Sequence, residues 1–465
     1  MLYLCLSLPQ LPLEALQPAA DEPAAVVDRH GAKRWLIACN QACHAAGICP
    51  GMDASTALAL QPALRLIERS TSSELETLRS LAAWAEQFSH WVCYDAGRML
   101  LWIEIKSCLR YFGGVGEIRS RVEHGLAQLG HAGFVGVAPT LEAAALLSRL
   151  DDAPVIQQLK LLVPSLEILP LAAMDLPEDT ADALVGLGLR TVGEVLALPR
   201  DSVGRRFGED LINYLDRLTG RRPDPRKPFR APRKYRRRFE LLGSVETTEG
   251  LLFPLRRMFE EMQGYLIARD TAVQEVQIDL GHDGRDPTRL EIRTTRPMRD
   301  AVRLFALVRE RLERTTLVGA VEKLILRADR FEPLGDTQLE LIDGGRKKDE
   351  GWDELLDRLR ARLGESAVRQ LGLQDQHLPE QAWCTMEGED ESGEPIPERP
   401  LWLVEPRAIT VLPQRLRKPE RIESGWWADE DMRRDYYTAE APDGARLWLY
   451  RDADRDGWYL HGLWA

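Results

Sequence analysis

The opening segment of the chain constrains its fold more than any other feature. Residues 2–8, LYLCLSL, form a short and almost unbroken apolar run, which is typical of a strand buried on both faces. Strand-like and helix-like segments then alternate, and one pair of strands surrounds the turn Asp95-Ala96-Gly97. This order predicts an α+β sheet domain with helices on one face. The later segments expected in this domain are strands at 92–94, 100–105 and 133–138 and helices at 73–88, 115–130 and 141–150.

Changes in composition divide the rest of the chain and predict an α+β multidomain protein. A sharp turn, Gly186-Leu187-Gly188, lies between two expected helices. A helix-rich piece is expected to about residue 380, before a small β-rich unit with many Trp and Tyr residues. The segments are a helical stretch over 166–220, a proline-rich basic linker over 221–239, a second α+β unit over 240–332, a loop over 333–350 and a C-terminal region over 351–465.

Charge and cysteine content exclude several classes of protein. The chain has 61 basic and 73 acidic residues, a net charge of −12, which excludes a globally cationic DNA coat but not a local basic stripe. Its seven cysteines have no repeated spacing, so we expect neither a disulfide framework nor a zinc site. No Lys or Arg precedes Arg29, and prolines interrupt the apolar N-terminus. We therefore expect a reduced, cytoplasmic protein without a membrane segment.

Two motifs and the order of the segments resemble a Y-family translesion DNA polymerase. Residues Cys39–Met52 are similar to the fingers segment of that family, and Gly136–Thr140 is similar to its palm segment. The resemblance implies palm and fingers over 1–165, with the fingers inserted at about 13–74. The further parts that it implies are a thumb with a helix–hairpin–helix over 166–220, a basic tether over 221–239, a little finger over 240–332, a clamp-binding loop over 333–350 and a partner-binding region over 351–465.

The carboxylates that active members of that family use are replaced at the matching positions. Nucleotidyl transfer uses two hard cations, which need Asp or Glu ligands on the first strand and on the pair of strands. A thioether and an alkyl chain cannot hold magnesium. We therefore expect a polymerase fold without polymerase chemistry, with no catalytic residue, metal or cofactor. The four replaced positions are Ser7, Pro9, Met99 and Leu100.

This combination resembles the ImuB family, the catalytically inactive Y-family homologues of bacterial mutasomes. The resemblance implies a noncatalytic adaptor in SOS-type DNA-damage tolerance. The partners that it implies are primer–template DNA, the beta sliding clamp, an ImuA-like RecA-related protein and an ImuC-like error-prone translesion polymerase. The alternative is an active Y-family nucleotidyltransferase with displaced metal carboxylates such as Glu14, Asp95 and Glu104.

A pentapeptide in the loop after the second α+β unit is similar to a clamp-binding motif. It reads Gln338-Leu339-Glu340-Leu341-Ile342. Such peptides insert apolar side chains into a groove of the clamp, and their glutamine forms a hydrogen bond with the rim of that groove. The alternative is a short strand that buries Leu339 and Leu341. Gln370-Leu371-Gly372-Leu373 is a weaker candidate, because it is expected in or beside a helix and lacks the final apolar residue.

Two segments are candidates for DNA contact. The turn with Gly186 and Gly188, followed by Arg190, resembles a helix–hairpin–helix whose amide groups can bind a phosphate. The alternative is a purely structural turn. The segment between residues 221 and 238 contains ten basic residues and only one acidic residue. This composition favours a phosphate-binding role over a solvated linker. The best candidates there are Arg233, Lys234, Arg236 and Arg238.

Overall fold

The chain forms two compact units, Met1–Arg362 and Leu363–Ala465, and each unit is considered by itself. Among the described residues, no helix is long and apolar enough to cross a membrane. The computed structural model describes residues 1–16, 22–31, 33–333, 350–364, 367–374, 376–386, 398–400, 402–410, 416–417, 419–424, 432–442, 444–453 and 457–464.

The first unit is built around a four-stranded sheet, the first sheet, with the strand order β5-β6-β1-β7. All neighbouring strands are antiparallel, and Ser7 at the end of β1 lies opposite Leu100 of β6. The predicted strands are therefore present and share one sheet. Their bounds are β1 Tyr3–Ser7, β5 Val92–Asp95, β6 Leu100–Glu104 and β7 Phe134–Ala138.

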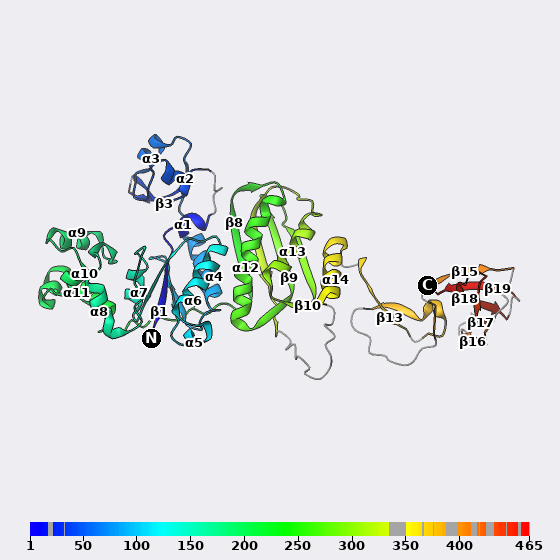
Figure 1. Ribbon diagram of the computed structural model, residues 1–465. Coiled ribbons are helices and arrows are strands. Elements are labelled where there is room, and N and C mark those ends of the chain that lie inside the picture. The colour runs from blue at the N-terminus through cyan, green and yellow to red at the C-terminus, as the bar shows by residue number, and fades with distance from the viewer. Residues whose placement is uncertain are drawn as a thin grey trace. The chain divides into compact units, whose positions relative to one another are not determined.

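Helices cover both faces of the first sheet, whereas the sequence predicts helices on one face. Leu4 and Leu6 of β1 pack with residues of α4 and α6, but Cys5 packs with residues of α7. The reason lies in β1, whose apolar side chains alternate between the two faces and leave neither face polar. Figure 1 shows these helices around β1. They are α4 Thr71–Ala85, α5 Leu109–Phe112, α6 Val115–Gln128 and α7 Leu141–Leu147.

Two further parts of the first unit flank this sheet. A three-stranded sheet with the order β3-β2-β4 lies between β1 and α4 in the chain. A helical unit follows α7 and shares its apolar core. The bounds are α1 Leu11–Glu14, β2 Ala24–His30, β3 Lys33–Cys39, α2 Gln41–Ala45, α3 Ala54–Leu60, β4 Arg65–Glu68, α8 Leu159–Glu167, η1 Leu171–Ala173, α9 Glu178–Gly186, α10 Val192–Leu196 and α11 Arg200–Thr219.

The second α+β unit contains a sheet with the order β10-β9-β11-β8, and α12 and α13 pack on one of its faces. The expected linker over 221–239 ends earlier than predicted, because β8 begins at Tyr235. Tyr235 and Phe239 point into the core there, and this burial makes the segment a strand. The bounds are β8 Tyr235–Val245, η2 Glu249–Leu251, α12 Leu252–Arg269, β9 Thr271–His282, β10 Thr288–Met298, α13 Ala301–Leu312, β11 Val321–Ala328, β12 Glu332–Pro333 and α14 Glu350–Leu363.

Helix α4 joins the first sheet to the second α+β unit, because it packs against α12 as well as β1 (Figure 1). The indole of Trp84 lies between Gly125 of α6 and Gly264 of α12, and a Cβ at either glycine would overlap the ring. Beside it, Arg237 donates to Glu261 at 2.8 Å and to Thr77 of α4 at 3.3 Å. Both charged side chains are buried, and leaving either of them without its partner would be strongly destabilising. The pair therefore favours this arrangement of α4 and α12.

The second unit contains a hairpin and a five-stranded sheet with the order β15-β19-β18-β17-β16, which confirms the predicted C-terminal β-rich unit. Tyr436, Trp448 and Tyr450 form its core. The helix expected in or beside residues 370–373 is instead β13, which pairs with β14, because Gly372 disfavours a helix and the hairpin supplies partners. The bounds are β13 Gln370–Leu373, η4 Pro379–Gln381, β14 Trp383–Met386, β15 Trp402–Ala408, β16 Glu420–Ser424, β17 Met432–Glu440, β18 Arg446–Asp452 and β19 Trp458–Leu463.

Candidate functional site

The four replaced positions lie at one end of the first sheet. Ser7 is paired with Leu100 across β1 and β6, and Leu100 is buried. Met99 has a left-handed backbone with φ 53°, and its carbonyl accepts a 3.0 Å hydrogen bond from the amide of Leu8. Pro9 follows the strand and is exposed. The structure thus brings Ser7, Met99 and Leu100 together, and none of them offers a carboxylate.

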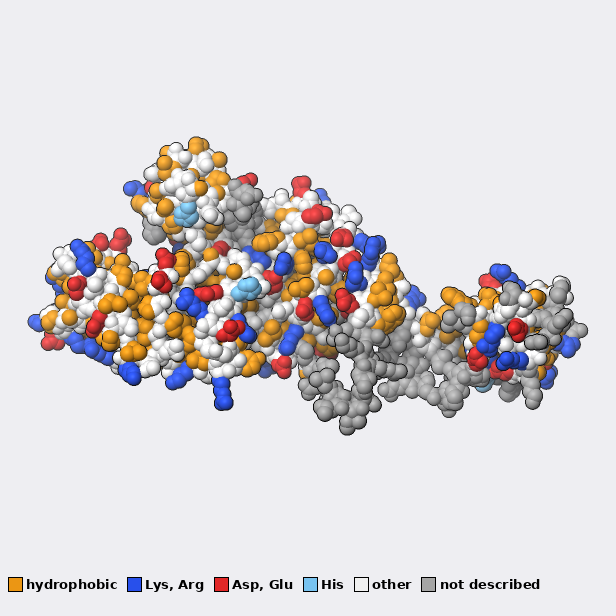
Figure 2. Space-filling model, viewed as in Figure 1, with side chains coloured by type: hydrophobic (Ala, Val, Ile, Leu, Met, Phe, Trp, Pro, Cys, Tyr) orange, Lys and Arg blue, Asp and Glu red, His pale blue; other side chains and the backbone are white. Residues whose placement is uncertain are grey.

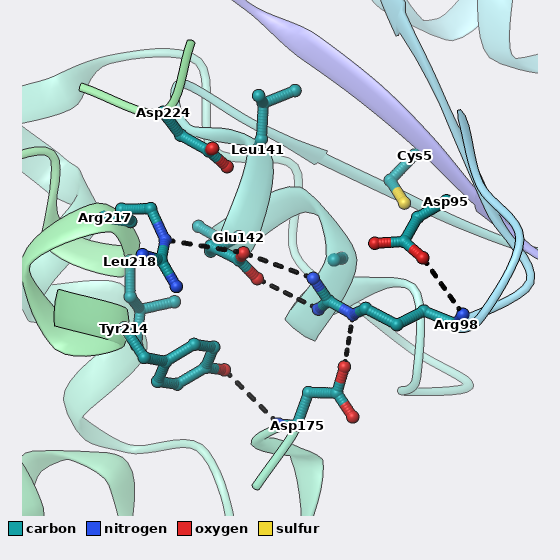
Figure 3. A network of polar contacts seen from close by, with 12 residues as sticks. Cys5, Asp95, Arg98, Leu141, Glu142, Asp175, Tyr214, Arg217, Leu218 and Asp224 are labelled. Atoms are coloured by element: carbon teal, nitrogen blue, oxygen red, sulfur yellow. Dashed lines mark hydrogen bonds and ion pairs between the residues drawn. The ribbon is translucent and has the colours of Figure 1, made fainter. Parts of the chain in front are cut away.

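A buried carboxylate next to this strand end is paired with arginine. Glu142 of α7 is 2% exposed, and Arg98 donates to its two oxygens at 3.2 and 2.9 Å, as a bidentate pair. The Nε of Arg98 forms an ion pair with Asp175 (Figure 3). Arg98 directly precedes Met99 in the turn between β5 and β6, so this turn carries a cation that is bound to a buried carboxylate.

Two more arginines reach Glu142 from other parts of the first unit. Arg226 donates to Glu142 at 3.3 Å, and it forms ion pairs with Asp95 at 3.3 Å and with Asp224 at 3.1 Å. Its guanidinium also lies 4.4 Å from the ring centroid of Trp102, a cation–π distance. Arg217 of α11 lies 3.8 Å from Glu142. Glu142 therefore binds the turn, the helical unit and the linker segment together.

The charges of this cluster are balanced, which determines what it can bind. Each of its four carboxylates has an arginine partner, and an arginine stays protonated at any physiological pH. Divalent cations would meet fixed positive charges here rather than free carboxylate oxygens. Among the described residues, no three His, Cys, Asp or Glu side chains are arranged to hold a metal ion. The cluster consists of Asp95, Glu142, Asp175 and Asp224 with Arg98, Arg149, Arg217 and Arg226.

Two thiols lie on the same face of the first sheet as this cluster. Burial raises the pKa of Cys93 to about 12. Burial raises the pKa of Cys5 even further. Both thiols therefore stay protonated at neutral pH, where a thiol is a poor metal ligand. The sulfur atoms thus behave as apolar parts of the core.

The displaced carboxylates of the alternative enzyme do not come together. Glu104 ends β6 opposite Tyr3, whereas Asp95 lies opposite Leu100 at the other end of the strand, about 13 Å away at the usual rise per residue. Glu14 accepts hydrogen bonds from His131 and from the amide of Ala132, both at 2.8 Å. The three carboxylates thus occupy separate environments and cannot share a pair of metals.

The helix–hairpin–helix candidate is a tight turn with internal partners. Gly188 has a φ of 85°, which favours glycine, and Arg190 donates from its side chain to the carbonyl of Val185 at 3.4 Å. The amides of Arg190 and Thr191 both donate to one carboxylate oxygen of Glu194, at 2.5 and 3.1 Å. These bonds hold the pKa of Glu194 below its usual value. A phosphate could use those two amides only after displacing Glu194.

The basic candidates extend onto a strand. Arg236 and Arg238 are exposed on one face of β8, whereas Arg237 between them points inward. Lys234 pairs with Asp329 at 3.1 Å, and both side chains are exposed. Figure 2 shows Lys and Arg side chains mixed with Asp and Glu over the second α+β unit. The same sheet face carries cations that the sequence analysis missed and that strict alternation along the strands could have found: Arg289, Arg293, Lys323 and Arg327.

The proposed clamp-binding peptide lies outside the described residues, so Gln338, Leu339, Glu340, Leu341 and Ile342 remain a prediction. The weaker candidate is visible at β13, where Leu371 is exposed. Its placement on a strand removes the helical alternative for that segment.

Comparison with known proteins gives one family of relatives. The chain is 28% identical to Protein ImuB of Caulobacter vibrioides strain NA1000 / CB15N over 458 residues, which covers 90% of this chain and 99% of that protein. Protein ImuB of strain ATCC 19089 matches equally well. No family model matches the chain. The predicted resemblance to ImuB is confirmed.

Solved structures of Y-family polymerases are also similar to this chain. DinB from Sulfolobus solfataricus is 13% identical, with a TM-score of 0.40, and the match covers 71% of this chain and 98% of that chain. An insertion ternary complex of Dbh DNA polymerase has the same identity and TM-score, over 72% of this chain and 100% of that chain.

Replacing Glu142 with Gln tests the arginine cluster. We expect Glu142→Gln to lower the free energy of unfolding by about 3 kcal/mol, because it leaves three guanidinium groups around a neutral amide. The matched control is Glu123→Gln on α6, whose carboxylate is 43% exposed and pairs with Arg119. That change should cost less than about 0.5 kcal/mol. Urea denaturation followed by tryptophan fluorescence measures both, and equal effects would contradict a structural role for the cluster.

Proposed function

We propose that this chain is a noncatalytic adaptor in SOS-type DNA-damage tolerance. In this role it binds primer–template DNA and the beta sliding clamp and recruits an error-prone translesion polymerase of the ImuC type, together with an ImuA-like RecA-related protein. The observation that carries the proposal is the similarity to Protein ImuB over 90% of the chain, combined with the residues at the strand end of the first sheet.

The strand end supports a noncatalytic role on chemical grounds. Two-metal phosphoryl transfer needs carboxylates that bridge cations about 3.5–4 Å apart. Ser7 and Leu100 supply no such ligand, and the nearest buried carboxylate, Glu142, is engaged by three arginines. A palm-like sheet without metal ligands keeps its shape and loses its chemistry, as an adaptor requires.

The second α+β unit supplies the surface best suited to DNA. Its open sheet face carries cations on β8, β10 and β11. Arg236 and Arg238 lie about 7 Å apart along β8, and Arg289 and Arg293 lie about 13 Å apart along β10. The charges of two of these cations are partly neutralised, because the Asp279 carboxylate pairs with Arg289 and with Arg327. A face of this mixed kind suits moderate, sequence-independent binding of phosphates in an acidic protein.

A primer-extension assay separates the adaptor from the alternative enzyme. We expect no template-dependent extension with all four nucleotides and either magnesium or manganese, because the metal positions are Ser7, Pro9, Met99 and Leu100. Extension that disappears in the Asp95→Ala and Glu104→Ala variants would come from this chain and would contradict the proposal. Extension that persists at an equal rate in these two variants and in Glu14→Ala indicates a contaminating polymerase.

Salt dependence of DNA binding tests the basic segment. Changing Arg233, Lys234, Arg236 and Arg238 to Gln should make the log–log salt slope for duplex DNA shallower by about 3–4 units, because each lost phosphate contact removes about 0.9. Fluorescence anisotropy over a range of salt concentrations measures the slope. The control changes Arg119 and Arg121 of α6, two cations that lie outside the basic segment. An unchanged slope in the first set would place the DNA contacts elsewhere.

Clamp binding tests the adaptor role directly. Changing Gln338, Leu339 and Leu341 to Ala should weaken binding to purified clamp more than about tenfold, because two apolar anchors and the rim hydrogen bond are lost. Ile342→Phe should tighten it, since an aromatic ring fills an apolar pocket with more area. Calorimetry measures both, alongside thermal melts.

The control for the clamp experiment is the alanine set at Gln370, Leu371 and Leu373 of β13. It should leave clamp affinity unchanged. If only the control set abolishes binding, the peptide has been misassigned. If neither set matters, the adaptor proposal fails.

A further inference from the structure

A cavity of about 510 Å³ lies at the end of the first sheet opposite the replaced positions. Its wall includes Ser107, shortly after β6 ends at Glu104, which lies about 13 Å along the strand from Leu100. Figure 1 shows α5 near this end of β1, where the N-terminus lies. Pockets that hold ligands usually measure about 300–1,000 Å³. We call this one the α5 cavity, and its walls include Glu86, His90, Tyr111, Phe112, Arg230 and Arg269.

An exposed aromatic ring stands at the α5 cavity. The side chain of Tyr111 is 85% exposed, and its ring meets that of Phe112 edge to face, with the centroids 4.9 Å apart. Phe112 in turn lies 5.9 Å from Phe88, which contacts Trp84 of the core at 5.2 Å. The Tyr111 ring is therefore supported from within and still leaves area on which a planar ligand can stack.

The charge left uncompensated at the α5 cavity is positive. The acid in its wall, Glu86, binds Arg269 at 3.1 Å and accepts a hydrogen bond from the amide of Ala231 at 3.3 Å. Arg230 is exposed and donates to the neutral carbonyl of His90 at 3.4 Å. Among the described residues, Arg230 forms no ion pair. Its guanidinium is thus available to an anion.

The segment that carries Tyr111 adds two more exposed cations, Lys106 and Arg110. One carboxylate lies in the same segment, Glu104. It accepts hydrogen bonds from the hydroxyl of Ser107 at 2.8 Å and from the amide of Lys106 at 3.2 Å. The cations therefore outnumber the acids around the exposed ring, and the site favours an anionic ligand.

A flat ring beside exposed cations matches the chemistry of an unpaired nucleic-acid strand. Its bases stack on aromatic rings, and its phosphates pair with Lys and Arg. The bases of a duplex are already stacked on each other, so a duplex gains nothing from the ring. An acidic peptide would use the cations and leave the ring without a planar partner. Arg230 also belongs to the basic linker, so the cations of that linker continue to the α5 cavity.

We propose that the α5 cavity holds an unpaired base of single-stranded DNA, stacked on Tyr111, with the adjoining phosphate on Arg230. The choice of DNA rests on the proposed function. The site is separate from the duplex contact proposed for the second α+β unit. The end of α12 lines the α5 cavity, and α12 packs on one face of that sheet, whereas Arg236 and Arg238 lie on the other.

Fluorescence anisotropy of the full chain with a labelled oligothymidylate of about 12 nucleotides tests the stacking. We expect Tyr111→Ala to weaken binding about fivefold or more, because a base loses its aromatic partner, and Tyr111→Trp to retain it. Affinity for duplex DNA should not change. The control is Phe253→Ala on α12, an aromatic position that is 64% exposed and outside the α5 cavity. Thermal melts establish that each variant is folded.

An abasic oligonucleotide of the same length separates stacking from charge. On this probe Tyr111→Ala should have no effect, whereas Arg230→Gln should weaken binding to both oligonucleotides. An equal loss with Tyr111→Ala on both probes would overturn the stacked base.

The remaining outcomes distinguish this inference from the proposed function. A chain that binds duplex DNA, but whose affinity for oligothymidylate ignores Tyr111→Ala, would overturn this inference alone. A chain that binds neither DNA would overturn both. A synthetic acidic peptide with one tryptophan is the probe for a protein partner. If it binds in a Tyr111-dependent manner and the oligothymidylate does not, the α5 cavity docks a protein and the inference is wrong.

Discussion

The ion cluster around Glu142 holds three segments of the first unit in one place. Its single carboxylate binds Arg98 from the strand turn, Arg217 from α11 and Arg226 from the linker. A buried charge is stable only when it is fully partnered, so these segments must all be in position before the carboxylate can be desolvated. Glu142 thus helps to hold the helical unit against the first sheet, in addition to the apolar core that α7 and the helical unit share.

The same cluster neutralises the carboxylates at one end of the first sheet. Carboxylates that gather at a strand end repel each other unless cations neutralise them. Here the cations are guanidinium groups that belong to the chain, such as Arg98 and Arg226, and Trp102 covers the second of them. The charge balance is therefore independent of any bound ion, which is consistent with a structural use of this region.

Local pattern was enough to predict the strands of the first sheet, the strand end with Ser7 and Leu100, and the C-terminal β unit. Each of these depends on neighbouring residues or on a known motif. The arginine cluster was not predicted, because Glu142 lies 44 positions from Arg98 and 84 positions from Arg226. The end of the basic linker was placed too late, at residue 239, although the alternation of Arg236 and Arg238 already indicated a strand that begins there. The hairpin at β13 was missed because its partner strand begins ten residues later.

The position of Trp84 has a mechanical consequence. Its indole is confined between Gly125 of α6 and Gly264 of α12, so sliding one helix past the other would drive a backbone into the ring. Close packing of this kind deforms little under load. The packing of Trp84 therefore fixes the orientation of the first sheet relative to the second α+β unit. Whatever binds the open face of the second α+β unit is held at a set offset from the first sheet, and this part of the chain behaves as a rigid spacer instead of a hinge.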